Sequence, residues 1–428
     1  MKVAFLVPSL TFSGGVNVIV EHASRLAAMS DFEVTVILTE DDLQPARMRQ
    51  RLDGADIISL KDAGGLSFDI AIATWWKTVP DLLRLSASQS AYFVQSLEDR
   101  FYRPGSEGAV VAGLTYELGI PVITEAHWIS ELFRTVRPNT PCYYVRNGIN
   151  KTYFPVASEV TANEDGPLRV LIEGDPTHPL KAVPDALEAA RMMKQPAQVT
   201  LVSNGDVGHG LDVDVLGPLT QVELSEVYAQ NDVLLKLSTV EGMAGPPLEA
   251  FHRGATCVTS EVTGNDEYVR HGWNGLVTAW DDPHGTARTL DLLAKDRRLL
   301  TYLQTNALAT AADWPTWEES SAEFAHALRD LATQPAFSAS AVRPLMMAAT
   351  DNAYRYTHER DVAVHNRNLA HIALNELRIE LRKLQKSRAI QTIDRVDLLM
   401  RGARRSARLG ARISRIQKKT DPNWNAPK

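Results

Sequence analysis

The sequence predicts an α/β protein made of two doubly wound parallel-sheet domains that face a cleft, followed by a C-terminal helical extension. Three observations support this fold class. Short apolar segments alternate with amphipathic helical segments, a polar break interrupts the alternation, and the alternation then restarts. Apolar strands separated by amphipathic helices are typical of parallel sheets covered on both faces. The 428 residues are enough for two such domains and an appendage.

The first predicted domain covers residues 1–155. Short apolar runs predict its strands over residues 3–7, 33–38, 56–60, 69–73, 91–94, 122–124 and 143–145. Amphipathic spacing predicts its clearest helices over residues 16–29 and 130–136. The Asn147-Gly148 turn near its end predicts a tight bend with a positive φ.

The second predicted domain covers residues 165–332, after a polar linker at 151–167. Its strands are expected over residues 169–172, 198–202, 232–237, 256–259 and 275–278. Its helices are expected over residues 183–193, 224–230, 247–252, 285–308 and 314–331. A helical extension at 345–428 follows, with long helices expected over residues 349–385 and 389–419.

Composition indicates a cytoplasmic protein. Hydrophobic residues make up 44% of the chain and charged residues 23%, as in ordinary globular proteins. Cys142 and Cys257 are too few for a disulfide framework, which favours a reducing compartment. The first residues have the pattern of a buried strand rather than a signal peptide, and no apolar run reaches the roughly 18 residues of a membrane span.

Charge is distributed unevenly along the chain. Residues 371–428 hold 15 Lys and Arg against 5 Asp and Glu, a net charge of +10. The net charge of the whole chain is −7, so residues 1–370 carry −17. From residue 389, apolar side chains recur every three or four positions opposite a row of arginines. This basic helix fits an anionic membrane surface, a coiled coil or a protein partner, and we favour the membrane. The acidic body argues against nucleic acid.

The most informative segment covers residues 231–254. An apolar strand leads into a glycine-bearing loop with Glu241, and Pro246 and Pro247 then open a helix that carries Glu249 in its first turns. A strand, loop and helix in this order direct backbone N–H groups toward an anion such as a diphosphate. Two carboxylates beside that anion would suit the hydroxyls of a sugar.

This segment resembles the E-x7-E signature of family 4 glycosyltransferases, which are retaining, nucleotide-sugar-dependent enzymes with the GT-B fold of two Rossmann-like domains. The matching residues are Tyr228, Asp232, Val233, Ser238, Glu241, Gly242, Pro247, Leu248, Glu249, Ala250, Gly254 and Val258, followed by residues 274–277. The resemblance covers residues 1 to about 332. It implies transfer of a sugar from a nucleotide-diphosphate-sugar donor to a glycan or lipid-linked glycan, and it implies that the helix at 314–331 packs back on the first domain.

The resemblance also implies roles for the donor-side residues. Glu241 is the candidate catalytic residue and contacts the donor sugar, whereas Glu249 holds the ribose hydroxyls. The loop between them lines the donor, through Gly242, Met243, Ala244 and Gly245.

Lys181 and a glycine loop complete the expected donor site. Lys181 matches the family lysine that neutralises the diphosphate. Gly14 and Gly15 resemble the paired-glycine loop near the donor diphosphate and the acceptor. Asp175 stands where the family usually has a second cation, an arginine, and Arg146 or His178 are the substitutes nearest in sequence.

The first domain is expected to bind the acceptor. The candidate acceptor-binding residues are Trp75, Trp76, Gln95 and Glu98, with His127 as a second catalytic candidate that orients the acceptor. Tryptophans in the core and a structural histidine are the alternatives. The stretch at 93–98 is similar to that of bacterial glycan-assembling enzymes, including rhamnan-type rhamnosyltransferases, which points to polysaccharide biosynthesis.

No metal and no cofactor are expected. The triplet from Asp212 to Asp214 has the D-x-D form that another glycosyltransferase fold uses for a cation, but its place before Leu216 favours a solvated surface. No histidine and cysteine cluster has zinc spacing. Two other functions stay open: a non-catalytic GT-B scaffold that binds a glycan or a synthase partner, and a sugar-nucleotide epimerase.

Overall fold

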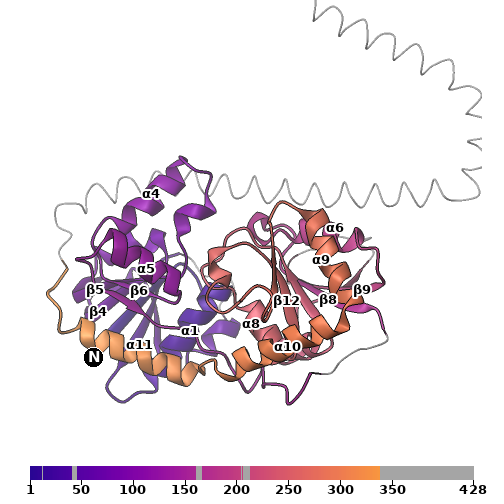
Figure 1. Cartoon of the computed structure of the whole chain (residues 1–428). Coiled ribbons are helices and arrows are strands. Elements are labelled where there is room, and N and C mark those ends of the chain that lie inside the picture. The colour runs from indigo at the N-terminus through magenta and orange to yellow at the C-terminus, as the bar shows by residue number, and fades with distance from the viewer. Residues whose placement is uncertain (12, 41–45, 161–165, 204, 206–212, 338–428) are drawn as a thin grey trace, which may run out of the picture. The chain divides into compact units, whose positions relative to one another are not determined.

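The computed structural model describes residues 1–11, 13–40, 46–160, 166–203, 205 and 213–337 (Figure 1). Two parallel sheets with interleaved helices make up this part of the chain, which confirms the predicted α/β architecture. The predicted helical extension at 345–428 lies outside the described residues. None of the described helices combines the length and the apolar character needed to cross a bilayer.

The first sheet has seven parallel strands in the order β3-β2-β1-β4-β5-β6-β7. The strands are β1 Lys2–Val7, β2 Glu33–Leu38, β3 Asp56–Ser59, β4 Ser67–Ala73, β5 Ser86–Val94, β6 Val122–Thr124 and β7 Cys142–Tyr144. All seven were predicted, but β5 begins five residues before the predicted residue 91. Its first half is polar and gives no apolar signal, yet it pairs with β4 from Ser86 onward.

The second sheet has six parallel strands in the order β10-β9-β8-β11-β12-β13. They are β8 Leu168–Glu173, β9 Ala197–Val202, β10 Asp214–Leu216, β11 Val233–Lys236, β12 Thr256–Ser260 and β13 Leu276–Thr278. The sequence did not predict β10, because this short edge strand is fully exposed and pairs with β9. Strand order reverses between β8 and β11, and ligands of such sheets bind beyond the carboxyl ends of the strands at that reversal.

Eleven α-helices cover the sheets in the described part of the chain. They are α1 Gly14–Ala27, α2 Ala46–Arg49, α3 Val79–Leu82, α4 Glu107–Tyr116, α5 His127–Val136, α6 Val183–Arg191, α7 Gln221–Ala229, α8 Pro246–His252, α9 Pro283–Lys295, α10 Arg297–Ala312 and α11 Trp317–Leu331. The single helix predicted at 285–308 is wrong. Asp296 leaves the helical conformation at ψ 83°, and its carboxylate caps α10 by accepting from the Leu299 N–H at 3.0 Å.

The last helix, α11, packs against the first sheet, as predicted, and lies beside α1 in Figure 1. Trp317 and Phe324 join the core of that sheet, and the Ser321 hydroxyl lies 3.0 Å from Nδ1 of His22 on α1.

The chain reaches α11 by passing Gly148, where a Cβ would lie 2.4 Å from the backbone nitrogen of Trp317. The positive φ predicted for this turn is not found, since Gly148 is absent from the described residues with positive φ. Glycine is needed here because two backbone segments lie in close contact.

Candidate active site

The carboxyl ends of β8 and β11 hold a buried ion pair. Lys236 is the last residue of β11, and its Nζ lies 2.6 Å from Oε2 of Glu173 and 3.3 Å from the Glu173 carbonyl oxygen. The Lys236 side chain is only 3% exposed. The sequence analysis did not identify either residue. A signal was present, because a lysine within an apolar strand has to find a partner when it is buried.

A second ion pair joins two predicted residues. Nζ of Lys181, at the end of a short 3₁₀ turn, lies 2.9 Å from Oε1 of Glu241. Burial alone would raise the pKa of Glu241, but the positive charges of Lys181 and Lys236 outweigh it, and the pKa is lowered. Burial lowers the pKa of Lys181, and Glu241 more than compensates, so that pKa is raised. Both groups are therefore charged at neutral pH.

Glu249 lies in the first turn of α8, as predicted, and is partly exposed. Burial and then the charge of Glu173 raise its pKa to about 7, against the opposing effects of the Tyr228 hydroxyl and the Lys236 ammonium. This carboxyl therefore changes its protonation state near neutral pH. When it is ionised, it can accept two hydrogen bonds from a vicinal diol.

Asp175 stands where the family has an arginine, and it adds no positive charge to the site. Its Oδ1 accepts from the N–H of Thr177 at 2.8 Å and from the Thr177 hydroxyl at 2.7 Å, so the carboxylate shapes the turn after β8. Of the two proposed substitutes, His178 is exposed. The Arg146 guanidinium lies 4.7 Å from the ring centroid of Trp314 and its Nε is 3.2 Å from the Tyr144 hydroxyl.

Three predicted residues, two from the first domain and one from the second, are in contact. Nε2 of Gln95 donates to the Gly15 carbonyl at 3.3 Å, and a Cβ on Gly15 would lie 3.1 Å from Oε1 of Gln95. A Cβ on Gly242 would lie 1.7 Å from the Gln95 carbonyl oxygen, so a side chain is excluded there. Gly14, by contrast, has open space on the side where a Cβ would stand. The glycine loop of the first domain and the loop after Glu241 are therefore in contact through Gln95.

The loop that follows Glu241 is fixed by neighbours on both sides. Nε1 of Trp128 donates to the Gly242 carbonyl at 2.8 Å, and the Met243 sulfur lies 3.6 Å from the Asn147 amide nitrogen. Ala244 is buried, and its carbonyl accepts from the Tyr268 hydroxyl. Gly245 caps α8 and has open space where a Cβ would stand. The predicted donor loop thus has a defined conformation in this structure.

Two of the acceptor-binding predictions are corrected. Trp76 and Glu98 are buried, and the Trp76 N–H donates to Oε2 of Glu98 at 2.7 Å. Burial raises the pKa of Glu98 to about 8, and the Tyr92 hydroxyl also donates to it. These side chains fill the interior of the first domain, so they offer no surface to an acceptor. Trp75 is partly exposed and stacks on Phe101, with ring centroids 5.6 Å apart.

His127 begins α5 and exposes 62% of its side chain, with Nε2 3.8 Å from the Glu131 carboxylate. Its neighbour Glu125 was not predicted. Glu125 is 5% exposed, and its Oε2 accepts from the Asn147 amide at 2.8 Å. Burial and the nearby negative charges of Glu267 and Glu241 raise the pKa of Glu125 to about 8. Glu125 is therefore a buried carboxyl of the first domain whose pKa is raised in part by the charge of Glu241.

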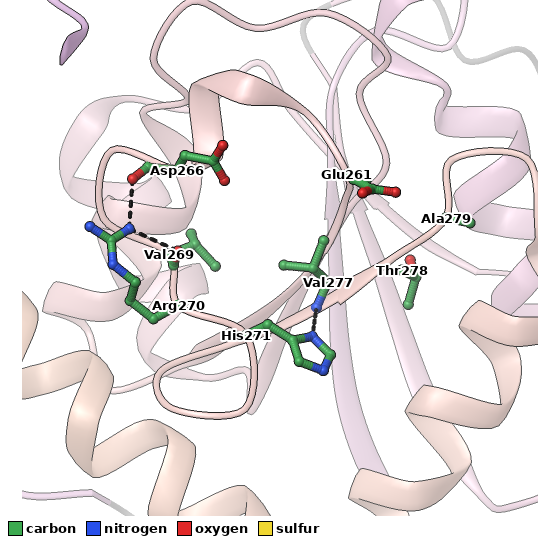
Figure 2. Close-up of a pocket in the computed structure, with 8 residues that line it drawn as sticks. All are labelled: Glu261, Asp266, Val269, Arg270, His271, Val277, Thr278 and Ala279. Atoms are coloured by element: carbon green, nitrogen blue, oxygen red, sulfur yellow. Dashed lines mark hydrogen bonds between the residues drawn. The ribbon is translucent and has the colours of Figure 1, made fainter. Parts of the chain in front are cut away.

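A separate concavity of about 670 Å³ opens at the ends of β12 and β13 (Figure 2). It is lined by Glu261, Asp266, Val269, Arg270, His271, Val277, Thr278 and Ala279. Nδ1 of His271 accepts from the Val277 N–H at 2.9 Å, and the Arg270 guanidinium donates to backbone carbonyls of its own loop. None of the predicted donor or acceptor residues lines this concavity.

The structure bears only in part on the D-x-D triplet. Asp214 is exposed at the start of β10, whereas Asp212 lies outside the described residues. No group of three or more His, Cys, Asp and Glu side chains in the described ranges is arranged to hold a metal ion. Independence from metal stays a prediction.

Part of the chain is similar to known proteins. Residues 205–310 match the family model described as Glycosyl transferases group 1, and this region contains both Glu241 and Glu249. N-acetyl-alpha-D-glucosaminyl L-malate synthase of Bacillus anthracis is 28% identical over 186 residues, which cover 40% of this chain and 49% of that protein. The chain therefore spans about half the length of this curated relative.

Solved structures share the fold over most of the chain. Anabaena Alr3699/HepE in complex with UDP and glucose has a TM-score of 0.63 and 16% identity, and covers 77% of this chain and 100% of its own. Sucrose-phosphate synthase from Thermosynechococcus elongatus has a TM-score of 0.62 and 17% identity, with coverages of 77% and 98%. The fold is GT-B. Within this fold, residues 205–310 match the model of a glycosyltransferase domain.

Proposed function

We propose that this protein transfers a sugar from a nucleotide-diphosphate-sugar donor to a glycan or lipid-linked glycan acceptor, with retention at the anomeric carbon. The observation that carries the proposal is the Lys181–Glu241 pair at the carboxyl edge of the second sheet. Glu249 lies close by in the chain, in the first turn of the helix that follows the Glu241 loop. One cation and two carboxylates suit the three chemical parts of such a donor.

Each of these residues takes one part of the donor. Lys181 neutralises the diphosphate, and it stabilises the negative charge that grows as the bond between sugar and phosphate breaks. Glu241 accepts hydrogen bonds from hydroxyls of the transferred sugar, and Glu249 accepts them from the ribose. UDP in the complexes of Anabaena HepE supports a nucleoside diphosphate as the ligand of this fold.

Retention follows if the acceptor hydroxyl attacks from the face that the leaving group departs from. The departing phosphate then takes the acceptor proton, so a dedicated protein base is not required. In this mechanism the protein positions the two substrates and stabilises charge. Gln95, which contacts both Gly15 and Gly242, is placed to order the first domain against the donor loop.

The acceptor and the setting rest on the sequence. The resemblance at residues 93–98 supports bacterial cell-surface polysaccharide as the product, with rhamnose as the first sugar to test. The basic segment from residue 389 supports peripheral attachment to the cytoplasmic face of the cell membrane, where lipid-linked acceptors are found.

The test is nucleotide release from a panel of UDP-, GDP- and dTDP-sugars in the presence of bacterial polysaccharide or lipid-linked acceptors. We expect release with one donor, and a product whose anomeric configuration by NMR equals that of the donor. Glu241→Gln should lower turnover by about 100-fold or more, since a charged hydrogen bond at the transition state is lost. Glu188→Gln, at an exposed glutamate of α6, is the matched control and should have no effect.

Three results would count against the proposal. Tight donor binding without release for any acceptor would indicate a scaffold. An inverted product would exclude retention. Loss of transfer in EDTA that magnesium restores would show that the diphosphate site depends on a cation other than Lys181.

A further inference from the structure

The donor site contains a second lysine that comes from the sheet itself. Lys236 ends β11 and is held by the carboxylate and the carbonyl oxygen of Glu173, at the point where strand order reverses. We propose that Lys236 is a positioning residue of the nucleotide site, which balances the charge of Glu173 so that Glu249 can bind the ribose as a carboxylate. This inference rests on the proposed function and adds a residue to it.

Charge balance in the cluster points to this role. Glu173, Glu241 and Glu249 supply up to three negative charges, and Lys181 already pairs with Glu241. Without Lys236, Glu173 and Glu249 would act on each other as like charges, and the remaining cation, Lys181, is already paired with Glu241. The arginine expected near the start of this domain is absent, since Asp175 stands there and its carboxylate forms the local turn. Lys236 therefore supplies the second positive charge of the site.

Burial makes Lys236 a positioning residue rather than a direct ligand of the nucleotide. Its side chain is 3% exposed, so the diphosphate does not reach it in this structure. Its charge still acts on both Glu241 and Glu249. The titratable groups that act on this pair or on Glu249 are Lys181 in the 3₁₀ turn, Tyr228 on α7, Glu241 in the loop, Glu249 itself on α8 and Tyr268 before β13.

The sign of the pH effect follows from Glu249. Below about pH 7 this carboxyl is protonated and has lost acceptor capacity, and above it the carboxylate binds the ribose diol. Nucleotide affinity should therefore rise as pH rises through about 7. Removing the charge of Lys236 raises the pKa of Glu249 and moves this rise to higher pH. Removing the charge of Glu173 lowers that pKa and moves the rise to lower pH.

The experiment measures UDP, GDP and dTDP binding by calorimetry between pH 5.5 and 8.5, on the full chain. The effect is read from UDP and GDP, because the deoxyribose of dTDP lacks the 2′-hydroxyl and therefore the diol. The variants are Lys236→Met, Lys236→Arg and Glu173→Gln, with Lys295→Met, at an exposed lysine of α9, as the control. We expect Lys236→Met to weaken binding about tenfold at pH 7 and to move the midpoint up by about one pH unit. Lys236→Arg should restore both values, and Glu173→Gln should move the midpoint down.

A second ligand separates this role from a general structural one. The 2′,3′-dideoxy form of the preferred nucleotide keeps the diphosphate, whose last ionisation has a pKa of about 6, but lacks the ribose diol. Its affinity should therefore vary less with pH around 7 than that of the natural nucleotide in the wild-type chain. If it varies as the natural nucleotide does, the assignment of Glu249 and Lys236 to the ribose is wrong.

The remaining outcomes are also decisive. If Lys236→Met binds with wild-type affinity and midpoint, the inference fails while the proposed transfer stands. If Lys236→Met does not fold, Glu173→Gln decides: a lower midpoint supports the inference and an unchanged one overturns it. If the wild-type chain binds none of the three nucleotides, the proposed function fails, and this inference fails with it.

Discussion

Nζ of Lys181 donates to Oε1 of Glu241 at 2.9 Å, although 60 positions separate the two residues in the chain. The pair unites the cation proposed for the diphosphate with the carboxylate proposed for the transferred sugar. In the proposed function, the diphosphate of the donor would therefore compete with Glu241 for the Lys181 ammonium. This competition favours ligands that carry both an anion and a hydroxyl-bearing sugar, because only such ligands replace both halves of the pair.

The first prediction concerns the energy of this pair. Lys181→Met and Glu241→Gln should each destabilise the fold by about 1–2 kcal/mol, a range reduced for the 34% exposure of the lysine. The double variant should lose less than the sum, since neither charge is then left unpaired. Urea denaturation of the four proteins measures the coupling. The Arg191–Glu188 pair, half-exposed at 3.7 Å, is the control and should give a coupling of at most about 0.5 kcal/mol.

The second prediction concerns Gly242. A methyl group there would overlap the Gln95 carbonyl oxygen, so Gly242→Ala should prevent the contact between the two loops. Transfer should fall about 100-fold or more, because misplacement of about 1 Å is enough for such a loss. Nucleotide affinity should change little. Gly113→Ala, at a glycine of α4 with open space where a Cβ would stand, should retain activity. Wild-type turnover in Gly242→Ala would show that the active state lacks this contact.

The third prediction concerns Ala182, which follows Lys181 with φ 46° and ψ 36° in the left-handed region. A non-glycine residue there costs about 1–2 kcal/mol. Ala182→Gly relieves that cost but loses a buried methyl group and chain rigidity, each worth about 0.5–1 kcal/mol, so its stability should stay within about 1 kcal/mol of wild type. Ala189→Gly, buried inside α6, has no such relief and should destabilise by about 1–2 kcal/mol. Equal losses in chemical denaturation would contradict the assignment of strain to Ala182.

The fourth prediction concerns the basic C-terminal segment, for which the sequence predicts a helix and which lies outside the described residues. The full chain should sediment with vesicles that contain anionic lipid, and deletion of residues 386–428 should abolish this binding while nucleotide binding is kept. Each Lys or Arg near the surface contributes about 1 kcal/mol, so higher salt should release the protein. A chain that ignores anionic vesicles but changes its oligomeric state on deletion would identify the helix as an assembly element.

Periodicity predicted the two sheets because their central strands are buried on both faces and consist of continuous apolar residues. It failed where a strand or a helix boundary depends on pairing or capping. The polar first half of β5 is held by β4, and Asp296 ends one helix and caps the next within an unbroken helical pattern. Such features depend on a partner or on a single side-chain hydrogen bond, and neither leaves a periodic signal.

The candidate site was predictable only where its residues lie on a recognisable loop. Glu241 stands in a glycine-bearing loop and Lys181 in a turn that begins with Pro179, and sequence patterns mark both well. Lys236 and Glu173 stand at the ends of buried strands, and their pairing depends on the order of strands in the sheet. Trp76 and Glu98 follow strands too, but their side chains turn inward, where the Trp76 indole N–H donates to the Tyr102 hydroxyl and Glu98 accepts from the Trp76 backbone N–H. Sequence alone does not specify the direction in which a residue after a strand points.

The return of α11 to the first sheet has a consequence for folding during synthesis. The Ile149 N–H donates to the Pro315 carbonyl at 3.1 Å, and Trp317 and Phe324 then complete the core that begins with β1. The ribosome therefore has to synthesise the whole second sheet before α11 can pack on the first domain. Until then, the inner face of α1 lacks its cover, so the domain made first is finished last. A nascent chain that stalls after the first domain has been made and before α11 has been made would expose that apolar face to chaperones or to aggregation.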